Sequence, residues 1–168
     1  MDREQLFLAK LAEESIEICI EMEKLSAQIP VVCFSNTEDF KAEVNDLLGV
    51  IQLLNVEFGF NYTVRFDSFK PSPNQLLVLP KTIIRTSLDL SKLALKAQQF
   101  GLSDQYTGYE ENIAVRLHRL LDELFAAIAG LKSHYGINFS PRQDSIAAKM
   151  EKINKFAEYS KEKGLLQN

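Results

Sequence analysis

The chain has 168 residues, of which 46% are hydrophobic and 25% are charged, with a formal net charge of −4. This size and composition indicate one soluble domain and exclude a disordered chain, and the acidic balance offers no footprint for duplex DNA or RNA. No apolar stretch is long enough to cross a membrane, so we expect a cytoplasmic protein without a membrane partner. Cys19 and Cys33 have no histidine or cysteine near them at a zinc-ligand spacing, and we expect both to be reduced, with Cys19 in the core.

Apolar residues recur at helical spacing along most of the chain, and the alternation typical of strands is nearly absent. The predicted helices span residues 3–27, 38–59, 81–100, 110–135 and 142–163. We therefore expect an all-α fold in which five helices form a single bundle. Asn36 or Thr37 is predicted to cap the second helix, and Ser140 the last one, with Pro141 at its first position.

The first predicted helix concentrates carboxylates in the segment "LAEESIEICIEMEK", residues 11–24. Because each helical residue advances about 100°, Glu13, Glu14 and Glu17 fall within an arc of about 100° and share a face. Glu13, Glu17 and Glu21 are also spaced by four residues, which is typical of a solvated stripe. The first helix alone therefore leaves both interpretations open.

The second predicted helix changes the balance, because Glu43 falls inside its apolar stripe and Asp46 lies about 60° away at the edge of that stripe. A carboxylate that faces a core has to be paired, protonated or bound to a metal ion. The first helix offers Glu14 at the border of its apolar face, which is another acid. Acids that face acids indicate a cation, and oxygen ligands without His or Cys suit Mg²⁺ or Mn²⁺.

Residues 62–80 contain three prolines and show no helical period. A connection of this length inside a compact domain is usually functional or a linker. We predict that it is a linker between two halves of the chain.

The two halves resemble each other in sequence. A shift of 77 positions aligns residues 11–61 with 88–138 without a gap, so that Leu47 meets Leu124 whereas Glu43 meets Leu120. The core positions match and most acids do not, which favours a duplicated helical hairpin whose second copy, within residues 81–138, is degenerate. Chance agreement between two leucine-rich hairpins is the alternative.

The closing segment, residues 139–168, carries the last predicted helix. Its buried stripe is predicted to consist of Ile146, Met150, Ile153 and Ala157. Lys149 lies beside this stripe, and Asn154 lies on its other border. Lys152 and Lys155 point away from the stripe, which favours a solvated role for both.

Other metal and catalytic sites find no support in the sequence. A di-iron bundle needs Glu-x-x-His on two helices, and neither His118 nor His134 is preceded by glutamate at the required position. We therefore expect both histidines at the surface or at an interface. The chain also lacks a Ser/His/Asp set and a P-loop.

With E-E-x-x-E at 13–17 and E-x-x-D at 43–46, the sequence resembles the MazG-like all-α nucleotide pyrophosphohydrolases, a superfamily that includes the dimeric dUTPases. The surrounding segments "LAEESIEI", "FKAEVNDLLGVIQLLNVEFG" and "IAAKMEKINKFAEYSKEKGLL" are also similar, the last one to the closing helix of MazG-like proteins that are often phage-encoded. The resemblance implies a Mg²⁺-dependent enzyme, with Mn²⁺ as a possible substitute, that converts an NTP or dNTP to the monophosphate and pyrophosphate.

The resemblance also implies roles for individual residues. It makes residues 1–61 a catalytic hairpin whose metal ligands are Glu14, Glu17, Glu43 and Asp46. Glu13 would accept the proton of the attacking water, directly or through a second water, while Lys149 and Asn154 would contact the substrate. Two or more ions are expected with the nucleotide. Because the second hairpin lacks the acids, we expect one site per chain, in a monomer with an internal pseudo-dimer or in a homodimer.

Three interpretations remain open. The first is the nucleoside triphosphate pyrophosphohydrolase, and the second is a non-catalytic helical protein that binds a nucleotide or metal or serves in assembly. A purely structural bundle is the third, and it leaves Glu43 in its apolar stripe unexplained. The base of the nucleotide is not specified, although Gln5 and Asn55 could each read a base edge or lie at the surface.

Overall fold

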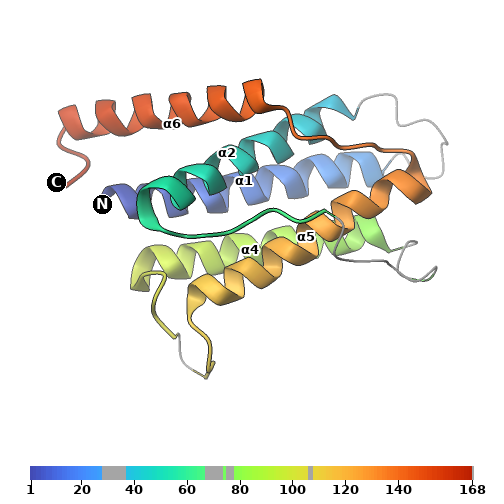
Figure 1. Ribbon diagram of the computed structural model, residues 1–168, viewed down its shortest axis with the longest axis horizontal. Coiled ribbons are helices and arrows are strands. Elements are labelled where there is room, and N and C mark those ends of the chain that lie inside the picture. Colours follow the sequence, from blue (N-terminus) through green and yellow to red (C-terminus); the bar gives the residue numbers. More distant parts are fainter. Residues whose placement is uncertain (28–36, 67–73, 75–77, 106–107, 168) are drawn as a thin grey trace.

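The computed structural model describes residues 1–27, 37–66, 74, 78–105 and 108–167. Its helices are α1 (Arg3–Ser26), α2 (Glu38–Phe58), α4 (Leu79–Phe100), α5 (Ile113–Tyr135) and α6 (Gln143–Glu162), shown in Figure 1. The described residues contain no strand, so the prediction of an all-α bundle of five helices is confirmed. None of the described helices is long and apolar enough to span a membrane.

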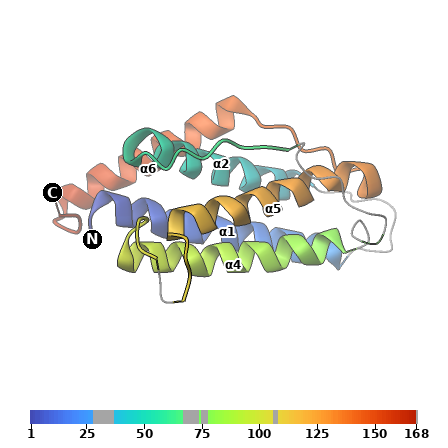
Figure 2. The same cartoon turned by 60° about the horizontal axis from the view of Figure 1, so that its bottom comes forward.

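The helices form two antiparallel hairpins, α1 with α2 and α4 with α5, and α1 packs along α4 between them (Figures 1 and 2). The last helix, α6, lies on the outer side of α2 and runs parallel to it (Figure 1). Side chains from both hairpins fill one apolar core, and Phe7, Leu47, Leu54, Leu124 and Phe125 are fully buried within it. Burial of these side chains is the main source of stability in such a bundle.

Local capping chemistry sets several helix boundaries. The carboxylate of Asp2 accepts a hydrogen bond from the Gln5 backbone N–H, and the Gln5 side chain accepts one from the Asp2 N–H, which together form a capping box. Asn112 caps α5 by accepting from the Val115 N–H, so α5 begins at residue 113 rather than at 110.

The prediction that Ser140 caps the last helix is wrong. α6 begins at Gln143, and the residue before it, Arg142, is extended and donates its backbone N–H to Asn45 Oδ1 at 2.9 Å. With Arg142 held against α2 in this way, α6 begins two residues after Pro141, so Pro141 is not its first residue. Thr37 stands at the cap of α2 but makes no side-chain capping bond, and Asn36 lies outside the described residues, as does Cys33.

The connection that leaves α2 packs closely against the second hairpin over its described part. Phe60 and Tyr62 are buried, the Tyr62 hydroxyl donates to Asp122 Oδ1 at 2.9 Å, and His118 Nε2 lies 2.7 Å from the Phe60 carbonyl oxygen. Asn55 holds the Tyr62 backbone with two hydrogen bonds of 2.8 Å. This part of the predicted linker therefore fixes one hairpin to the other.

The two hairpins end their second helices in the same way. Gly59 and Gly136, which are 77 positions apart, have φ values of 62° and 68° and donate their N–H groups to the carbonyl oxygens of Leu54 and Leu131. Glycine adopts this left-handed conformation without steric cost. The local geometry agrees with the proposed alignment of the halves, while the duplication itself stays a prediction.

Candidate metal centre

Three carboxylates converge where α1, α2 and α6 meet. One oxygen from each of Glu14, Glu43 and Asp46 lies within 4.8 Å of the other two. Glu14 comes from α1, whereas the other two come from consecutive turns of α2. The sequence motifs on the first two helices therefore meet in space as predicted.

The burial of these acids differs from the prediction. Glu14 is the buried carboxylate, with only 2% of its surface exposed, whereas Glu43 is half-buried. The reason lies in where α6 covers α2. The closing segment first contacts α2 at Asn45, and Lys149 on α6 then pairs with Glu14. Glu43 precedes Asn45 on α2, so it lies beyond the start of α6 and is less covered.

Lys149 places a positive charge among the acids. Its Nζ lies 2.6 Å from Glu14 Oε1 and 3.0 Å from Asp46 Oδ2, and its side chain is only 11% exposed. The buried carboxylate of Glu14 thus has a partner of opposite charge without a metal ion. The prediction that these acids face other acids and so need a cation is wrong for Glu14, because it compared the first two helices and left out α6, which carries Lys149.

Gly49 makes this arrangement possible, and the sequence interpretation did not single it out. A Cβ atom at this position would lie 3.0 Å from Lys149 Cβ and 3.1 Å from the Ile146 carbonyl oxygen, so the missing side chain lets α6 approach α2 closely. A glycine inside a helix costs about 1 kcal/mol relative to alanine. Its presence in the middle of "DLLGVIQLL" was the signal for a close helix contact.

Burial and the crowding of acids raise the pKa values of two carboxyl groups at this site, and Lys149 alone does not offset that effect. Burial, followed by the charges of Asp46, Glu14 and Glu17, raises the pKa of Glu43 from its ordinary 4.5 to about 7. The pKa of Glu14 is also raised, because burial outweighs the lowering effect of Lys149. For Lys149, burial acts to lower the pKa, but the hydrogen bonds and charges of Glu14 and Asp46 outweigh it, so the pKa is raised and the amine stays charged.

Glu43 has no hydrogen bond or ion pair with any residue that the structure describes, although it lies among three other acids. Among the described residues, this makes it the member of the cluster whose charge is least compensated. A bound divalent cation would remove that repulsion.

The remaining predicted site residues lie around the cluster. Glu17 is half-buried on α1, and its charge acts on Glu43, but its oxygens are outside the converging set. Glu13 is exposed and pairs with Lys10. Asn154 accepts a hydrogen bond of 2.6 Å from Arg3 Nη2, so a contact with substrate would have to use its amide nitrogen.

The two candidate base readers have structural partners. Gln5 completes the α1 capping box and donates from Nε2 to the Gln98 carbonyl oxygen at 3.1 Å, and Asn55 holds the Tyr62 backbone. Other predictions are confirmed: Lys152 and Lys155 are exposed, and Cys19 is buried. Of the histidines, His134 is exposed, whereas His118 is half-buried in the contact with the connecting segment.

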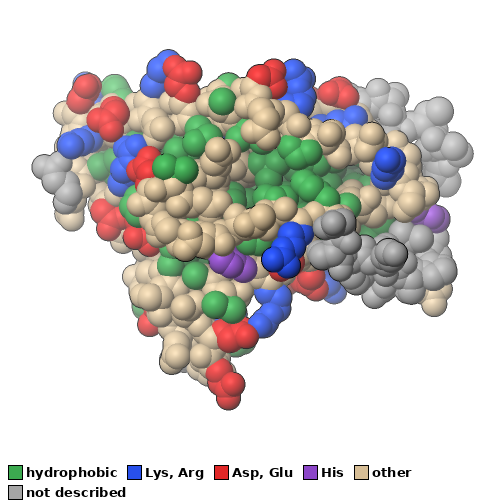
Figure 3. All heavy atoms as spheres, viewed as in Figure 1, with side chains coloured by type: hydrophobic (Ala, Val, Ile, Leu, Met, Phe, Trp, Pro, Cys, Tyr) green, Lys and Arg blue, Asp and Glu red, His purple; other side chains and the backbone are tan. Residues whose placement is uncertain are grey.

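An apolar cleft of about 340 Å³ lies on another side of α2, between α6 and the connecting segment. Leu48, Ile51, Val64 and Phe66 contribute to its walls, and Figure 3 shows apolar side chains gathered on this face of the molecule. On a helical wheel Leu48 points about 140° away from Glu43. None of the clustered acids lines this cleft, so it is a feature separate from the acid cluster.

Comparison of the chain with known protein families, curated proteins and solved structures gives no match. The fold and the site therefore define the protein only as an all-α bundle with an acidic cluster on its first hairpin.

Proposed function

We propose that this protein is a Mg²⁺-dependent nucleoside triphosphate pyrophosphohydrolase of the MazG-like kind, which converts an NTP or dNTP to the monophosphate and pyrophosphate. The convergence of Glu14, Glu43 and Asp46 within 4.8 Å, on two helices that carry the E-E-x-x-E and E-x-x-D motifs, is the observation that carries this proposal. In a purely structural bundle Glu43 would be repelled by three neighbouring acids, and the attraction of Lys149 offsets this repulsion only in part.

The donor set suits Mg²⁺ or Mn²⁺. Magnesium binds oxygen ligands about 2 Å from the ion, so ligands on opposite sides of it are about 4 Å apart. Small side-chain adjustments would bring Glu14, Glu43 and Asp46 to that spacing, whereas Glu17, whose charge acts on Glu43, would have to move to join the set. When bound, the ion would offset the negative charge of the triphosphate and lower the pKa of the attacking water.

The protein's own side chains would divide the remaining work. Glu43 would give up its proton when a cation binds, because only the carboxylate is a ligand. Lys149 would compete with the cation for Glu14 and Asp46, and an ammonium released from them would face the phosphates. Glu13 points toward Lys10, so we retain it as a proton acceptor only through an intervening water.

A second candidate function is non-catalytic binding of a nucleotide or metal on the same fold. One observation favours it: Lys149 already compensates Glu14 and Asp46, so much of the cluster is stable as an ion-pair network. The two functions differ in whether a bound nucleotide is hydrolysed, so an assay for the products distinguishes them directly.

The test is a panel of NTPs and dNTPs incubated with Mg²⁺ and scored for monophosphate and pyrophosphate. We expect release of pyrophosphate from at least one nucleotide, none with chelator, and a loss of at least about 100-fold in Asp46→Asn. Glu123→Gln, at the aligned position of the second hairpin, is the matched control and should keep full activity. A wild-type protein that binds nucleotide but releases neither product would establish the binding function instead.

A further inference from the structure

The side of the bundle that α1 and α4 form together leaves apolar side chains exposed. Figure 1 shows α2 and α5 in front of α1 and α4, so the exposed stripes of α1 and α4 lie on the opposite side, which we call the α1–α4 face. Ile16 and Ile20 on α1, and Leu88 and Leu95 on α4, are between 38% and 44% exposed. Exposed apolar side chains that gather on two adjacent helices, rather than lying singly, mark an interaction surface.

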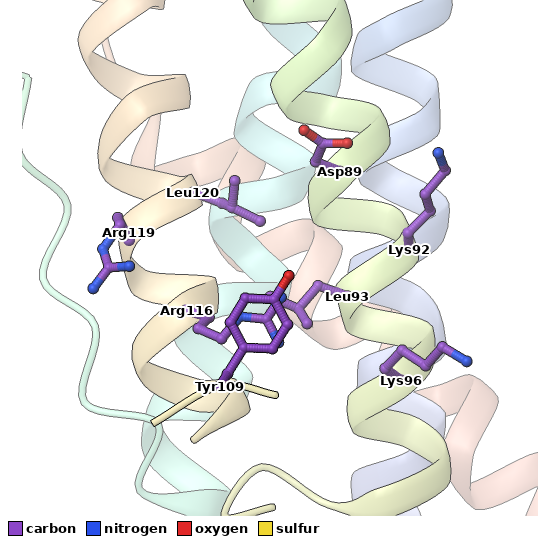
Figure 4. A pocket seen from close by; sticks show the side chains of 8 residues that line it. All are labelled: Asp89, Lys92, Leu93, Lys96, Tyr109, Arg116, Arg119 and Leu120. Atoms are coloured by element: carbon purple, nitrogen blue, oxygen red, sulfur yellow. The ribbon is translucent and has the colours of Figure 1, made fainter. Parts of the chain in front are cut away.

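The exposed stripes of the two helices carry opposite charges. On α1, Glu13 and Glu23 stand at the two ends of the apolar pair, whereas the stripe of α4 carries Lys81 and Lys92. Glu13 is paired within α1, but the other three have no ion pair with a residue that the structure describes. Figure 4 shows Asp89 on the side of α4 that borders a cleft of about 500 Å³ between α4 and α5, and the Lys92 amine pointing away from that cleft. The α1–α4 face is thus acidic along one helix and basic along the other.

α1 and α4 run antiparallel, and their heights along the pair are matched (Figure 1). The hydrogen bond of 3.1 Å from Gln5 Nε2 to the Gln98 carbonyl oxygen fixes one level. Because both helices rise about 1.5 Å per residue, this contact also sets which other positions are level with each other. These positions are Glu13 with Lys92, Ile16 with Leu88, Ile20 with Ile84, and Glu23 with Lys81.

We propose that the α1–α4 face joins two copies of the chain in a symmetric dimer, in which α1 of each copy packs on α4 of the other. A two-fold axis parallel to the helices, above the line between α1 and α4, exchanges the two helices and keeps level positions level. Ile16 then meets Leu88 of the partner copy, and Glu23 meets Lys81 of the partner copy. A two-fold axis across the helices would instead oppose glutamates to glutamates, so the charges favour the first arrangement.

The size of the face fits a dimer of this kind. α4 has 22 residues, which corresponds to a length of about 33 Å, and two adjacent helices of about 10 Å diameter cover a width of about 20 Å. The face therefore offers about 700 Å² per copy, close to the ~800 Å² per partner of a standard stable interface. Its apolar centre between charged ends also matches the anatomy of such interfaces.

A dimer through this face leaves the acid cluster accessible in both copies. On a helical wheel Glu14 points about 160° away from Ile16, and the cluster lies on the side of α1 that meets α2 and α6. Dimerisation therefore does not depend on the proposed metal site or on hydrolysis. Glu43→Gln should accordingly dimerise as wild type does.

The test is sedimentation equilibrium of the full chain over a concentration series that reaches about 100 μM, where a dimer with a micromolar Kd is largely formed. We expect wild type to sediment with twice the chain mass. Leu88→Glu should raise the dimer Kd at least about 100-fold, because it places a carboxylate against Ile16 of the partner copy. Val115→Glu introduces the same charge at a similarly exposed apolar position on α5, and this matched control should dimerise as wild type does.

An exchange of charges tests the pairing itself. Glu23→Lys alone and Lys81→Glu alone should each raise the dimer Kd about tenfold, because the dimer contains the altered contact twice. An equal mixture of these two variants should dimerise as tightly as wild type, since each variant then meets the opposite charge in its partner at both contacts. Both positions are exposed, so both variants should stay folded, which melts verify.

A wild type that stays monomeric, or a dimer that Leu88→Glu leaves unchanged, overturns the proposal. A mixture of the two charge variants that dimerises no better than either variant alone would refute the pairing of α1 with α4. Because the charge variants alter only exposed charged side chains, they test the interface even if Leu88→Glu does not fold.

Discussion

Glu14 on α1 and Lys149 on α6 form the most deeply buried ion pair among the residues that the structure describes, with side chains 3% and 11% exposed. Such a pair contributes little net stability compared with apolar side chains, yet the loss of one partner leaves the other charge buried and uncompensated. Its position among the candidate metal ligands therefore makes the ammonium a competitor for the cation. This competition can be measured.

Lys149→Met should lower the free energy of unfolding without metal by about 3 kcal/mol, because it leaves Glu14 buried without its partner. It should also enlarge the rise in melting temperature that Mg²⁺ or Mn²⁺ produces, since the cation no longer competes with an ammonium. Melts with and without metal measure both effects. Lys152→Met, at an exposed position of the same helix, is the control and should show neither. An unchanged metal response in Lys149→Met would argue against a shared site.

Glu43→Gln should abolish turnover and remove a pH dependence of stability. The pKa of Glu43 is raised in the folded protein to about 7 from 4.5, so the folded state binds its proton more tightly than the unfolded state does. This contribution is fully present below pH about 4.5 and is lost as the pH rises through about 7. Denaturant unfolding in chelator should show wild type losing more stability than Glu43→Gln over this range. Parallel pH profiles would contradict the raised pKa.

The approach of α6 to α2 depends on two features of α2 that lie one turn apart. The amide of Asn45 holds the backbone of Arg142 before α6 begins, and Gly49 leaves room for the first turns of α6. Together, these two contacts set the position along α2 at which the Lys149 side chain lies. The position of the ammonium is thus a property of the α2–α6 contact rather than of α6 alone.

Gly49→Val should therefore destabilise the fold by about 2 kcal/mol, because the added side chain overlaps Lys149 Cβ and the backbone of α6. Turnover should fall as well, since α6 would move and carry Lys149 away from Glu14. Thermal melts and the pyrophosphate assay measure the two effects. Ala148→Val, on the exposed side of α6, introduces the same side chain without that overlap and is the control. Full stability in Gly49→Val would mean that the close approach is not needed.

The two hairpins share a core but carry different surface chemistry. The acids of the first hairpin gather at the α1–α2–α6 junction, whereas the second carries exposed cations along α4. α1 belongs to the first region and α4 to the second, and the packing of α1 against α4 joins the two hairpins into one bundle (Figure 2). Metal binding at the first hairpin should consequently be seen in the unfolding of the whole molecule.

Mg²⁺ or Mn²⁺ should raise the melting temperature of the intact protein. An ion that binds only the native state adds RT ln(1 + [M]/Kd), about 2.7 kcal/mol at a concentration 100 times Kd. Differential scanning calorimetry across a metal titration measures this rise. It should vanish in Glu43→Gln and persist in Lys92→Glu/Lys96→Glu, whose substitutions lie on the other hairpin. Equal stabilisation of wild type and Glu43→Gln would place the cation elsewhere.

Much of the fold follows from local sequence patterns. Helical periodicity located every described helix to within three residues at each end. The same periodicity placed Glu14, Glu43 and Asp46 on or beside the apolar faces of their helices. It also placed Lys149 beside the buried stripe of the last helix. These properties depend on residues within a few turns of one another, so the linear sequence is enough to reveal them.

The partners of those residues depend on how distant helices pack. Glu14 is buried because α6 covers it, and Lys149 reaches Asp46, 103 positions earlier in the chain, because Gly49 and Asn45 fix the crossing of α6 on α2. The cavity between α4 and α5 likewise exists only because these two helices pack side by side. Periodicity reports which face of a helix is apolar, but not which other helix covers it. Charge pairing across helices is therefore determined by the packed structure.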